Sequence, residues 1–253
     1  MLVARRGDRL AALANELATA HGVRAAAIAL DLVARDAIPH LVAALTERRL
    51  DIGLVVHNAG FAVNGPFLAA DPARLVAQVD LHCRVPVELT RALLPAMVAR
   101  GHGAVIVVAS VAGYLAMASG SLYGATKAFD LHLAEGLCAE LRPLGIDAIA
   151  VSPGYTRTEF HQVAGIPMEG LPAWAWMSAD RVAETALTRL GRDASIVVGR
   201  RYRALMALIR LVPRGLLNRL ADRFFSRKLI RARADDPGNR EGDDRPPTGG
   251  HTP

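Results

Sequence analysis

The sequence predicts an α/β fold in which helices cover both faces of a mostly parallel sheet, a doubly wound arrangement. Short apolar runs of strand character alternate along the chain with segments whose leucines recur at helical spacing. Few polar residues interrupt these runs, which is typical of strands buried on both faces. The 253 residues, 52% of them hydrophobic, suffice for a single domain with one large core. This composition excludes a disordered chain and a disulfide-stapled small protein.

Strands and helices are expected in alternation from the first residues onward. Leu10, Leu13 and Leu17 share a helix face, and Gly22 ends that helix. Asp71 followed by Pro72 is a helix start, with an N-cap residue and then proline at the first helical position. We expect strands at 1–4, 23–30, 52–56, 104–109, 146–151 and 195–198, and further helices at 36–49, at 121–142 and from Ser178 onward.

Basic residues gather toward the C-terminus. The chain carries a net charge of +6, and thirteen basic residues stand between Arg189 and Arg233 against two acidic ones. Residues 200–233 are basic and amphipathic, with a break near Pro213, and residues 234–253 have too few apolar side chains to fold. We therefore expect a main domain over 1–199, a helical extension over 200–233 and a disordered tail over 234–253.

Three roles remain open for the segment 200–233. It could be a lid over the substrate opening, a contact between subunits, or an interfacial helix on anionic lipid at the inner face of the membrane. Nucleic acid is not expected as a partner, because aromatic residues do not interleave with the basic ones.

The cysteines and the N-terminus favour the cytoplasm. Cys83 and Cys138 form no Cys-x-x-Cys pair, and they suit a reducing compartment. The first six residues lack the charge order and the apolar length of a secretory signal. Eight histidines are scattered without the paired spacing of metal ligands, so no metal site is predicted.

Polar or glycine residues follow every predicted strand. In an open parallel sheet, ligands bind beyond the carboxyl ends of the strands. The strand ends together predict one continuous crevice, with these residues along it: Arg5, Arg6, Asp31, Leu32, His57, Asn58, Ala59, Gly60, Ser110, Ser152, Pro153 and Gly154.

Tyr123 and Lys127 lie four residues apart on one face of a predicted helix. A phenol has a pKa of about 10, and a nearby ammonium lowers it. Lowering it by about three units takes roughly 4 kcal/mol, which requires partial burial and a second positive charge such as an oxidised nicotinamide. Ser110 ends a strand thirteen residues earlier. Its hydroxyl could hydrogen-bond a substrate carbonyl, or it could simply cap a turn.

These motifs stand in the order and spacing of the short-chain dehydrogenase/reductase family. Asn58-Ala59-Gly60, Ser110, Tyr123-x-x-x-Lys127 and Pro153-Gly154 carry the resemblance, which extends from Leu2 to about Gly199. It implies a Rossmann-like fold and an oxidoreductase that interconverts a carbonyl and a secondary alcohol by hydride transfer to or from NAD(P).

The resemblance also implies a role for each matching residue. Tyr123 would be the general acid/base, Lys127 would lower its pKa and hold the nicotinamide ribose, and Ser110 would orient the substrate. The remaining cofactor contacts would be Asp31 and Leu32 at the adenine, Asn58, Ala59 and Gly60 at the adenine ribose, and Pro153, Gly154, Thr156 and Thr158 at the nicotinamide amide.

Arg5 and Arg6 follow the strand at which the family distinguishes its cofactors. An acidic residue there would accept a ribose 2′-hydroxyl, whereas arginine suits a 2′-phosphate. We therefore expect NADP in preference to NAD. A solvated arginine pair is the alternative interpretation.

The sequence departs from the family in having no glycine-rich pyrophosphate turn upstream of Asn58. The strand before that turn would be central, and without it the neighbouring strands would have unpaired backbone groups. We expect that the natural chain begins further upstream; a truncated fragment and a rearranged fold are the alternatives. A fragment unable to hold the cofactor, or a binding protein without catalysis, is accordingly the alternative function.

His82 is a second departure, because it falls where the family has a helix asparagine that holds a relay water. A histidine there could also bind water and could titrate near neutral pH, or it could have no catalytic part. His57, where the family often has an asparagine, is interpreted as structural.

The loop 155–177 contains Phe160, Met168, Trp174 and Trp176 and is expected to cover the substrate. Its apolar character favours a bulky apolar carbonyl or alcohol as the small-molecule substrate. The resemblance implies a homodimer or homotetramer that pairs through the helices near 72–99 and 121–142.

Overall fold

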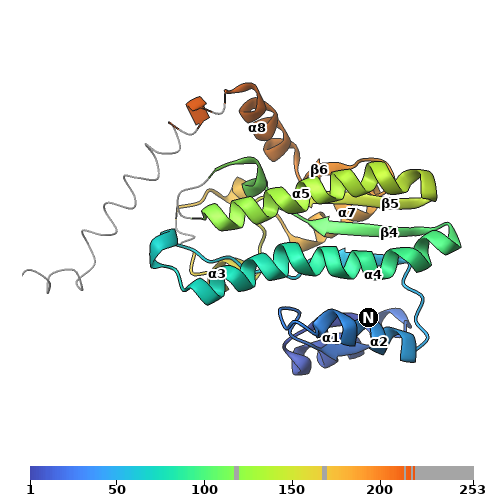
Figure 1. Cartoon of the computed structure of the whole chain (residues 1–253). Coiled ribbons are helices and arrows are strands. Elements are labelled where there is room, and N and C mark those ends of the chain that lie inside the picture. The colour runs from blue at the N-terminus through green and yellow to red at the C-terminus, as the bar shows by residue number, and fades with distance from the viewer. Residues whose placement is uncertain (117–119, 167–169, 214, 218, 220–253) are drawn as a thin grey trace, which may run out of the picture.

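A computed structural model describes residues 1–116, 120–166, 170–213, 215–217 and 219 (Figure 1). The strands are β1 Leu2–Ala4, β2 Ala27–Ala29, β3 Leu54–His57, β4 Gly103–Val108, β5 Ile146–Ser152 and β6 Ser195–Val197. The helices are α1 Gly7–His21, α2 Ala37–Glu47, α3 Pro72–Val79, α4 Val85–Arg100, α5 Ser121–Leu141, α6 Phe160–Val163, α7 Ala179–Arg189 and α8 Arg200–Leu211.

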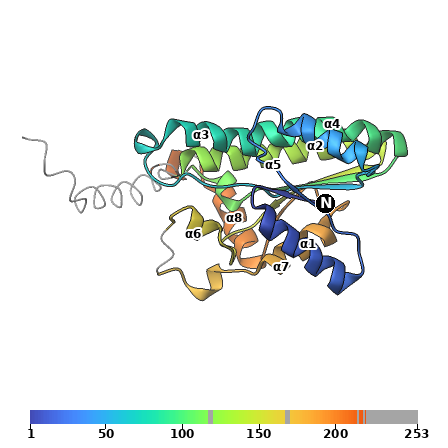
Figure 2. The same cartoon turned by 90° about the horizontal axis from the view of Figure 1, so that it is seen from below.

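All strand pairs of the described residues are parallel, and helices lie on both faces of the strands (Figure 2). One side carries α2, α4 and α5, and the other carries α1, α7 and α8. The predicted doubly wound α/β fold of a single domain is therefore confirmed.

The core follows the two-residue period of β4 and β5, which pair from Gly103↔Ile146 to Val108↔Val151. Val105 and Val107 of β4 pack with α5, whereas Ile106 packs with α7 and α8 on the opposite face. Because both faces are buried, β4 is apolar throughout and β5 is apolar from Ala148 to Val151.

The strands fall into two ladders, β1-β2 and β3-β4-β5-β6. The first ladder is joined to the rest through an apolar cluster in which Leu41 and Leu45 of α2 meet Val85 and Leu89 of α4. In the part of the chain that the structure describes, β1 pairs only with β2, and β3 pairs only with β4. The strand and glycine-rich turn that the resemblance places before Leu2 stay a prediction.

Most predicted boundaries agree with the observed ones within two residues, and two regions differ more. Residues 23–26 were expected to be strand but are irregular, because β1 is only three residues long and pairs with Ala27–Ala29 alone. The helix expected from Asp71 is interrupted by the π-helical turn Asp80–Arg84 between α3 and α4. The predicted helix 121–142 agrees with α5 within one residue.

The C-terminal apolar residues do not form one stripe. Tyr202 and Met206 of α8 are buried in the core, whereas Leu205, Leu208 and Leu211 are exposed on another side of the helix. The apolar side chains of α8 are therefore divided between the core and the outer surface. The helix ends before Pro213, as expected. The tail 234–253 and most of 214–233 lie outside the described residues.

Candidate active site

Ser110 follows β4 directly and caps the short 3₁₀ turn Val111–Tyr114, with its Oγ accepting a hydrogen bond from the Ala112 N–H at 3.1 Å. Gly113 lets this turn lie flat on α5, since a Cβ there would stand 2.8 Å from the Lys127 carbonyl oxygen. The close contact brings the Ser110 hydroxyl near the Tyr123 phenol, where it acts to lower the pKa of the phenol. The serine is therefore both a cap and a neighbour of the phenol.

Tyr123 is near the start of α5 in an apolar setting that disfavours its charged form. Burial, with a smaller contribution from the negative charge of Asp130, raises the pKa of Tyr123 to about 12, while the Ser110 hydroxyl acts in the opposite direction. The lowered pKa that the sequence analysis expects requires, besides Lys127, the positive charge of an oxidised nicotinamide, so it stays a prediction.

Lys127 directs its ammonium into the interior. Its Nζ donates to the Val108 carbonyl at 2.7 Å and to Asp130 Oδ2 at 2.9 Å, and it is 6.0 Å from the centroid of the Tyr123 ring. The positive charge is thus shared with an acidic partner that the motif Tyr123-x-x-x-Lys127 does not include. Asp130 is a residue that the sequence analysis missed, although its place one turn after Lys127 could have indicated it.

His82 is in the π-helical turn and is buried against α5. Its Nδ1 is 2.9 Å from Thr126 Oγ1, and its Nε2 accepts a hydrogen bond from the Phe61 N–H at 3.2 Å. Because the Thr126 hydroxyl donates to the Tyr123 carbonyl, Nδ1 is the protonated nitrogen of a neutral ring. Burial, followed by the positive charge of Lys127, lowers the pKa of His82 to about 3. Of the two alternatives for this ring, burial therefore disfavours titration near neutral pH.

His57 and Gly60 belong to the same tightly packed region. His57 Nε2 is 2.8 Å from Thr90 Oγ1, and burial lowers the pKa of His57 to about 4. This agrees with its interpretation as a structural residue. At Gly60, a Cβ would stand 2.8 Å from His82 Nε2. The glycine therefore allows the segment after β3 to reach the π-helical turn.

The residues expected around the adenine end sit mainly at the surface. Asp31 is exposed and its Oδ1 accepts from the Val33 N–H at 3.1 Å, whereas the Leu32 side chain is part of the core. Asn58 and Ala59 are exposed just beyond β3.

Arg5 and Arg6 are also exposed, where β1 leads into α1. Arg6 Nη1 lies 3.0 Å from a carboxylate oxygen of Glu159, and Arg9 Nη1 lies 2.7 Å from the other. These two arginines lower the pKa of Glu159. The start of α1 thus contacts the segment that follows β5.

The segment after β5 is held on both sides. The Pro153 carbonyl accepts from the Val111 N–H at 3.1 Å, which ties this strand end to that of β4. Gly154 lies against Tyr202 of α8 so closely that a Cβ would be 2.1 Å from the ring. Tyr202 in turn donates its hydroxyl to the Ala175 carbonyl at 2.7 Å. The sequence analysis did not single out Tyr202.

Thr156 and Thr158 are used locally. The Thr156 hydroxyl donates to the Gly154 carbonyl at 3.1 Å, and Thr158 Oγ1 accepts from the Phe160 N–H at 3.3 Å. Both threonines therefore shape the turn that leads from the strand to α6.

Aromatic rings extend from Tyr123 into the loop 155–177. Tyr123 contacts Phe160 at a centroid distance of 5.7 Å, Phe160 contacts His161 at 5.4 Å, and His161 contacts Trp176 at 5.6 Å. Trp174 is exposed, and Met168 lies outside the described residues. The rings form an apolar wall next to the phenol.

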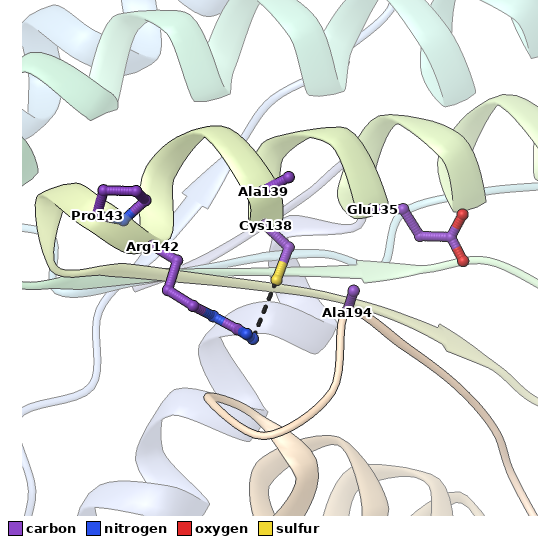
Figure 3. Close-up of a pocket in the computed structure, with 6 residues that line it drawn as sticks. All are labelled: Glu135, Cys138, Ala139, Arg142, Pro143 and Ala194. Carbon is purple, nitrogen blue, oxygen red and sulfur yellow. Dashed lines mark hydrogen bonds between the residues drawn. The ribbon is translucent and has the colours of Figure 1, made fainter.

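A separate surface pocket of about 360 Å³ lies beside the last turns of α5 (Figure 3). In it, Arg142 Nη2 is 3.3 Å from Cys138 Sγ. It contains none of the predicted site residues, and its first lining residue, Glu135, is twelve positions, or about 18 Å along the helix, from Tyr123.

The described residues contain neither a metal-binding cluster nor a membrane-spanning helix. Among them, no group of three or more His, Cys, Asp or Glu side chains is placed to hold a metal ion. None of the helices in this part of the chain combines the length and the apolar character needed to cross a membrane.

Comparison with known proteins shows which family the chain resembles. A family model described as short chain dehydrogenase matches residues 1–166. The chain is 36% identical over 163 residues to the serine 3-dehydrogenase of Agrobacterium fabrum, an alignment that covers 62% of this chain and 61% of that protein. It is 35% identical over 161 residues to the NADP-dependent 3-hydroxy acid dehydrogenase of Escherichia coli, covering 63% of each.

A solved structure agrees over a longer range. The short-chain dehydrogenase from Sphingobium yanoikuyae in complex with NADPH matches with a TM-score of 0.70 at 33% identity, covering 84% of this chain and 85% of that one. The chain therefore belongs to the short-chain dehydrogenase family. It spans 61% and 63% of the lengths of the two curated relatives named above.

Proposed function

We propose that this protein is an NADP-dependent oxidoreductase that interconverts a carbonyl and a secondary alcohol. The observation that carries the proposal is the meeting of Ser110 and Tyr123 at the carboxyl end of β4, with the buried Lys127 on the same helix face. Two hydroxyls at such a place can bind one carbonyl oxygen and move a proton to it. The family relatives and the NADPH-bound neighbour support the same reaction class.

Residues of this chain fit the two ends of the dinucleotide. At one end, Ser110, Tyr123 and Lys127 gather beyond β4. At the other, Arg5 and Arg6 offer guanidinium groups that suit a 2′-phosphate. When bound, NADPH supplies the hydride. Asp31, Leu32, Asn58, Ala59, Gly60, Pro153, Gly154, Thr156 and Thr158 are proposed as further contacts.

The protein residues supply orientation and a proton. The Ser110 hydroxyl binds the carbonyl oxygen and orients it toward Tyr123. Since the pKa of Tyr123 is raised to about 12, the phenol keeps its proton at neutral pH and can donate it as the carbonyl becomes an alcohol. In reduction the protonated phenol acts as the acid, whereas oxidation needs the phenolate and hence a nearby positive charge such as that of Lys127 or of an oxidised nicotinamide.

The aromatic wall of Tyr155, Phe160, His161 and Trp176 favours an apolar, bulky substrate. The resemblance further supports a homodimer or homotetramer formed through α4 and α5, which sedimentation would detect. We also propose that the exposed side of α8 contacts anionic lipid at the cytoplasmic face of the membrane.

Tyr123→Phe tests the proposed reaction, with Tyr114→Phe as a control that removes a phenol hydroxyl from the neighbouring turn. With NADPH and a panel of bulky ketones, we expect Tyr123→Phe to lower kcat at least about 100-fold, as for loss of a general acid. Tyr114→Phe should keep wild-type turnover. Unchanged turnover in Tyr123→Phe would refute the mechanism.

The alternative function is a binding protein without catalysis. Fluorescence titration with NADPH and NADH separates the two: micromolar binding with preference for NADPH supports the oxidoreductase, and no binding of either supports the alternative.

A further inference from the structure

A second surface pocket, of about 260 Å³, lies between α7, the end of β6 and the start of α8. Three of its eight lining residues are arginines, namely Arg181 and Arg189 of α7 and Arg203 of α8, and Gly199 at the start of α8 also lines it. Both helices cover the same face of the sheet (Figure 2). Among the described residues that line this pocket, none is proposed above as a contact of the cofactor or the substrate. The pocket is therefore a cationic hollow distinct from the candidate active site.

The arginines of α7 share one helix face with two threonines. Arg181, Thr185, Thr188 and Arg189 stand at positions i, i+4, i+7 and i+8, which lie on the same side of a helix. All four line the pocket, whereas the acidic residues of α7 do not. Arg181 and Arg189 are eight positions apart, or about 12 Å along the helix axis. The helix thus places positive charge, without a carboxylate of its own, along the length of the pocket.

Two of the three arginines carry a charge that no acidic side chain offsets in the part of the chain that the structure describes. Arg189 pairs through its Nε with Asp193. Arg181 and Arg203 form no ion pair with any described acidic residue. Like charges around one hollow repel each other, and an anion between them replaces this repulsion by attraction. The pocket is consequently matched to a ligand with two negative charges.

The hydrogen-bonding groups at the pocket suit a ligand that accepts. The hydroxyls of Thr185 and Thr188 donate to backbone carbonyls of α7 at 2.7 Å each, so their protons are already used. The first hydrogen bond of α8 runs from the Arg203 N–H to the Gly199 carbonyl at 3.0 Å. The N–H groups of residues 200–202 therefore have no acceptor among the described residues. Guanidinium groups together with backbone N–H groups are the donors that bind phosphate oxygens.

We propose that this pocket binds the phosphate group of a phosphate monoester, held between Arg181 and Arg203 beside the first turn of α8. A phosphate monoester carries a charge of about −1.5 to −2 at neutral pH, which matches the two unpaired guanidinium groups. The pocket volume approaches the lower end of small-molecule sites, about 300 Å³, so it also holds part of the group to which the phosphate is attached. A soluble metabolite and the headgroup of an anionic lipid both supply this chemistry. The inference does not depend on the proposed reaction.

The test is a titration of the ¹⁵N-labelled full chain with inorganic phosphate at constant ionic strength, followed by nuclear magnetic resonance. We expect the amide signals of Gly199 and Arg200 to shift saturably. In the double variant Arg181→Gln with Arg203→Gln, the dissociation constant of phosphate at this place should rise at least about tenfold, because charge-assisted hydrogen bonds are lost. Both arginines are exposed, so their replacement should leave the fold intact. Shifts no larger than those caused by chloride would overturn the proposal, since they would report screening alone.

Arg192→Gln is the matched control. It removes one positive charge from an exposed place between α7 and β6 that does not line the pocket. The dissociation constant of phosphate should stay within about twofold of the wild-type value, whereas Arg181→Gln alone should raise it several-fold. Equal weakening in Arg192→Gln and in Arg181→Gln would overturn the proposal, because net charge and not the pocket would then attract the anion.

Glycerol 3-phosphate and vesicles containing phosphatidic acid distinguish the two sources of the phosphate monoester. If the ligand is soluble, glycerol 3-phosphate saturates the shift of Gly199, and the double variant floats with phosphatidic acid vesicles as well as Arg192→Gln does. If the ligand is a lipid headgroup, the double variant floats less than both wild type and Arg192→Gln. Either result supports the pocket as a phosphate site. Failure of inorganic phosphate, glycerol 3-phosphate and phosphatidic acid vesicles alike to respond to the double variant would refute it.

Discussion

At the residue scale, whether a buried side chain in this protein is charged or neutral depends on the group that it contacts. Asp130 and Lys127 are both buried and face each other. His82 is surrounded by a hydroxyl and a backbone N–H and therefore stays neutral. The sequence shows the residue types and their spacing. The hydrogen-bond partners of His82, however, are the Phe61 N–H and the Thr126 hydroxyl, which are 21 and 44 residues away in the chain. Such pairing follows from the fold and not from local pattern.

Buried His82 and half-buried His57 predict a loss of stability in mild acid. The folded-state pKa is about 3 for His82 and about 4 for His57, below the unfolded value of 6.5. The unfolded chain therefore binds more protons below pH 6.5, and the free energy of unfolding falls as the pH drops. Between pH 6.5 and pH 5 we expect a loss of about 2 kcal/mol for each histidine.

Urea unfolding at neutral pH and at pH 5 measures this loss. His82→Asn should remove about half of the pH dependence. His132→Asn, which alters an exposed ring, should remove none of it. A pH dependence in His82→Asn equal to that of wild type would show that His82 is not neutral in the folded protein.

At the element scale, the spacing of apolar residues predicted most of the secondary structure. How the elements pack depends on places where a glycine lets two backbone segments or a ring come close together. The helix 121–142 and the strands β4 and β5 were predicted well, because their apolar patterns are long and regular. The short strands β1 and β2 were predicted less well, because three paired residues leave little pattern. The contacts of Gly113 with α5 and of Gly154 with α8 could not be predicted, since a glycine in a loop looks the same whatever lies against it.

Gly154→Ala tests the contact between the end of β5 and α8. The new methyl group would overlap the Tyr202 ring, so α8 must shift or the ring must leave its place. We expect the free energy of unfolding to fall by about 1–3 kcal/mol, as for overpacked sites. Gly136→Ala, a helix position with open space around its Cβ, should instead raise it by up to about 1 kcal/mol. Equal effects in urea unfolding would contradict the contact.

At the scale of the whole molecule, charge and exposed apolar surface coincide at the C-terminal end. The sequence has no acidic residue between Asp193 and Asp222, while arginines recur through this stretch. On α8, Tyr202 and Met206 are buried in the core and leave Leu205, Leu208 and Leu211 outside. A helix anchored by one side, with leucines and arginines on the other, has the composition of a segment that lies on an anionic lipid surface.

Flotation with vesicles of phosphatidylcholine and phosphatidylglycerol tests this surface. The protein should float with the vesicles at low salt and dissociate as salt screens the arginines. Leu208→Asp should weaken binding to the vesicles at least about tenfold. It removes an apolar side chain that would be buried in the lipid, and it adds a negative charge that the anionic lipid repels. Leu187→Asp on α7 is the matched control, since Leu187 is 60% exposed and Leu208 is 61% exposed. If both variants lose binding equally, net charge and not α8 attracts the lipid; if wild type does not float at low salt, the exposed leucines of α8 serve another partner.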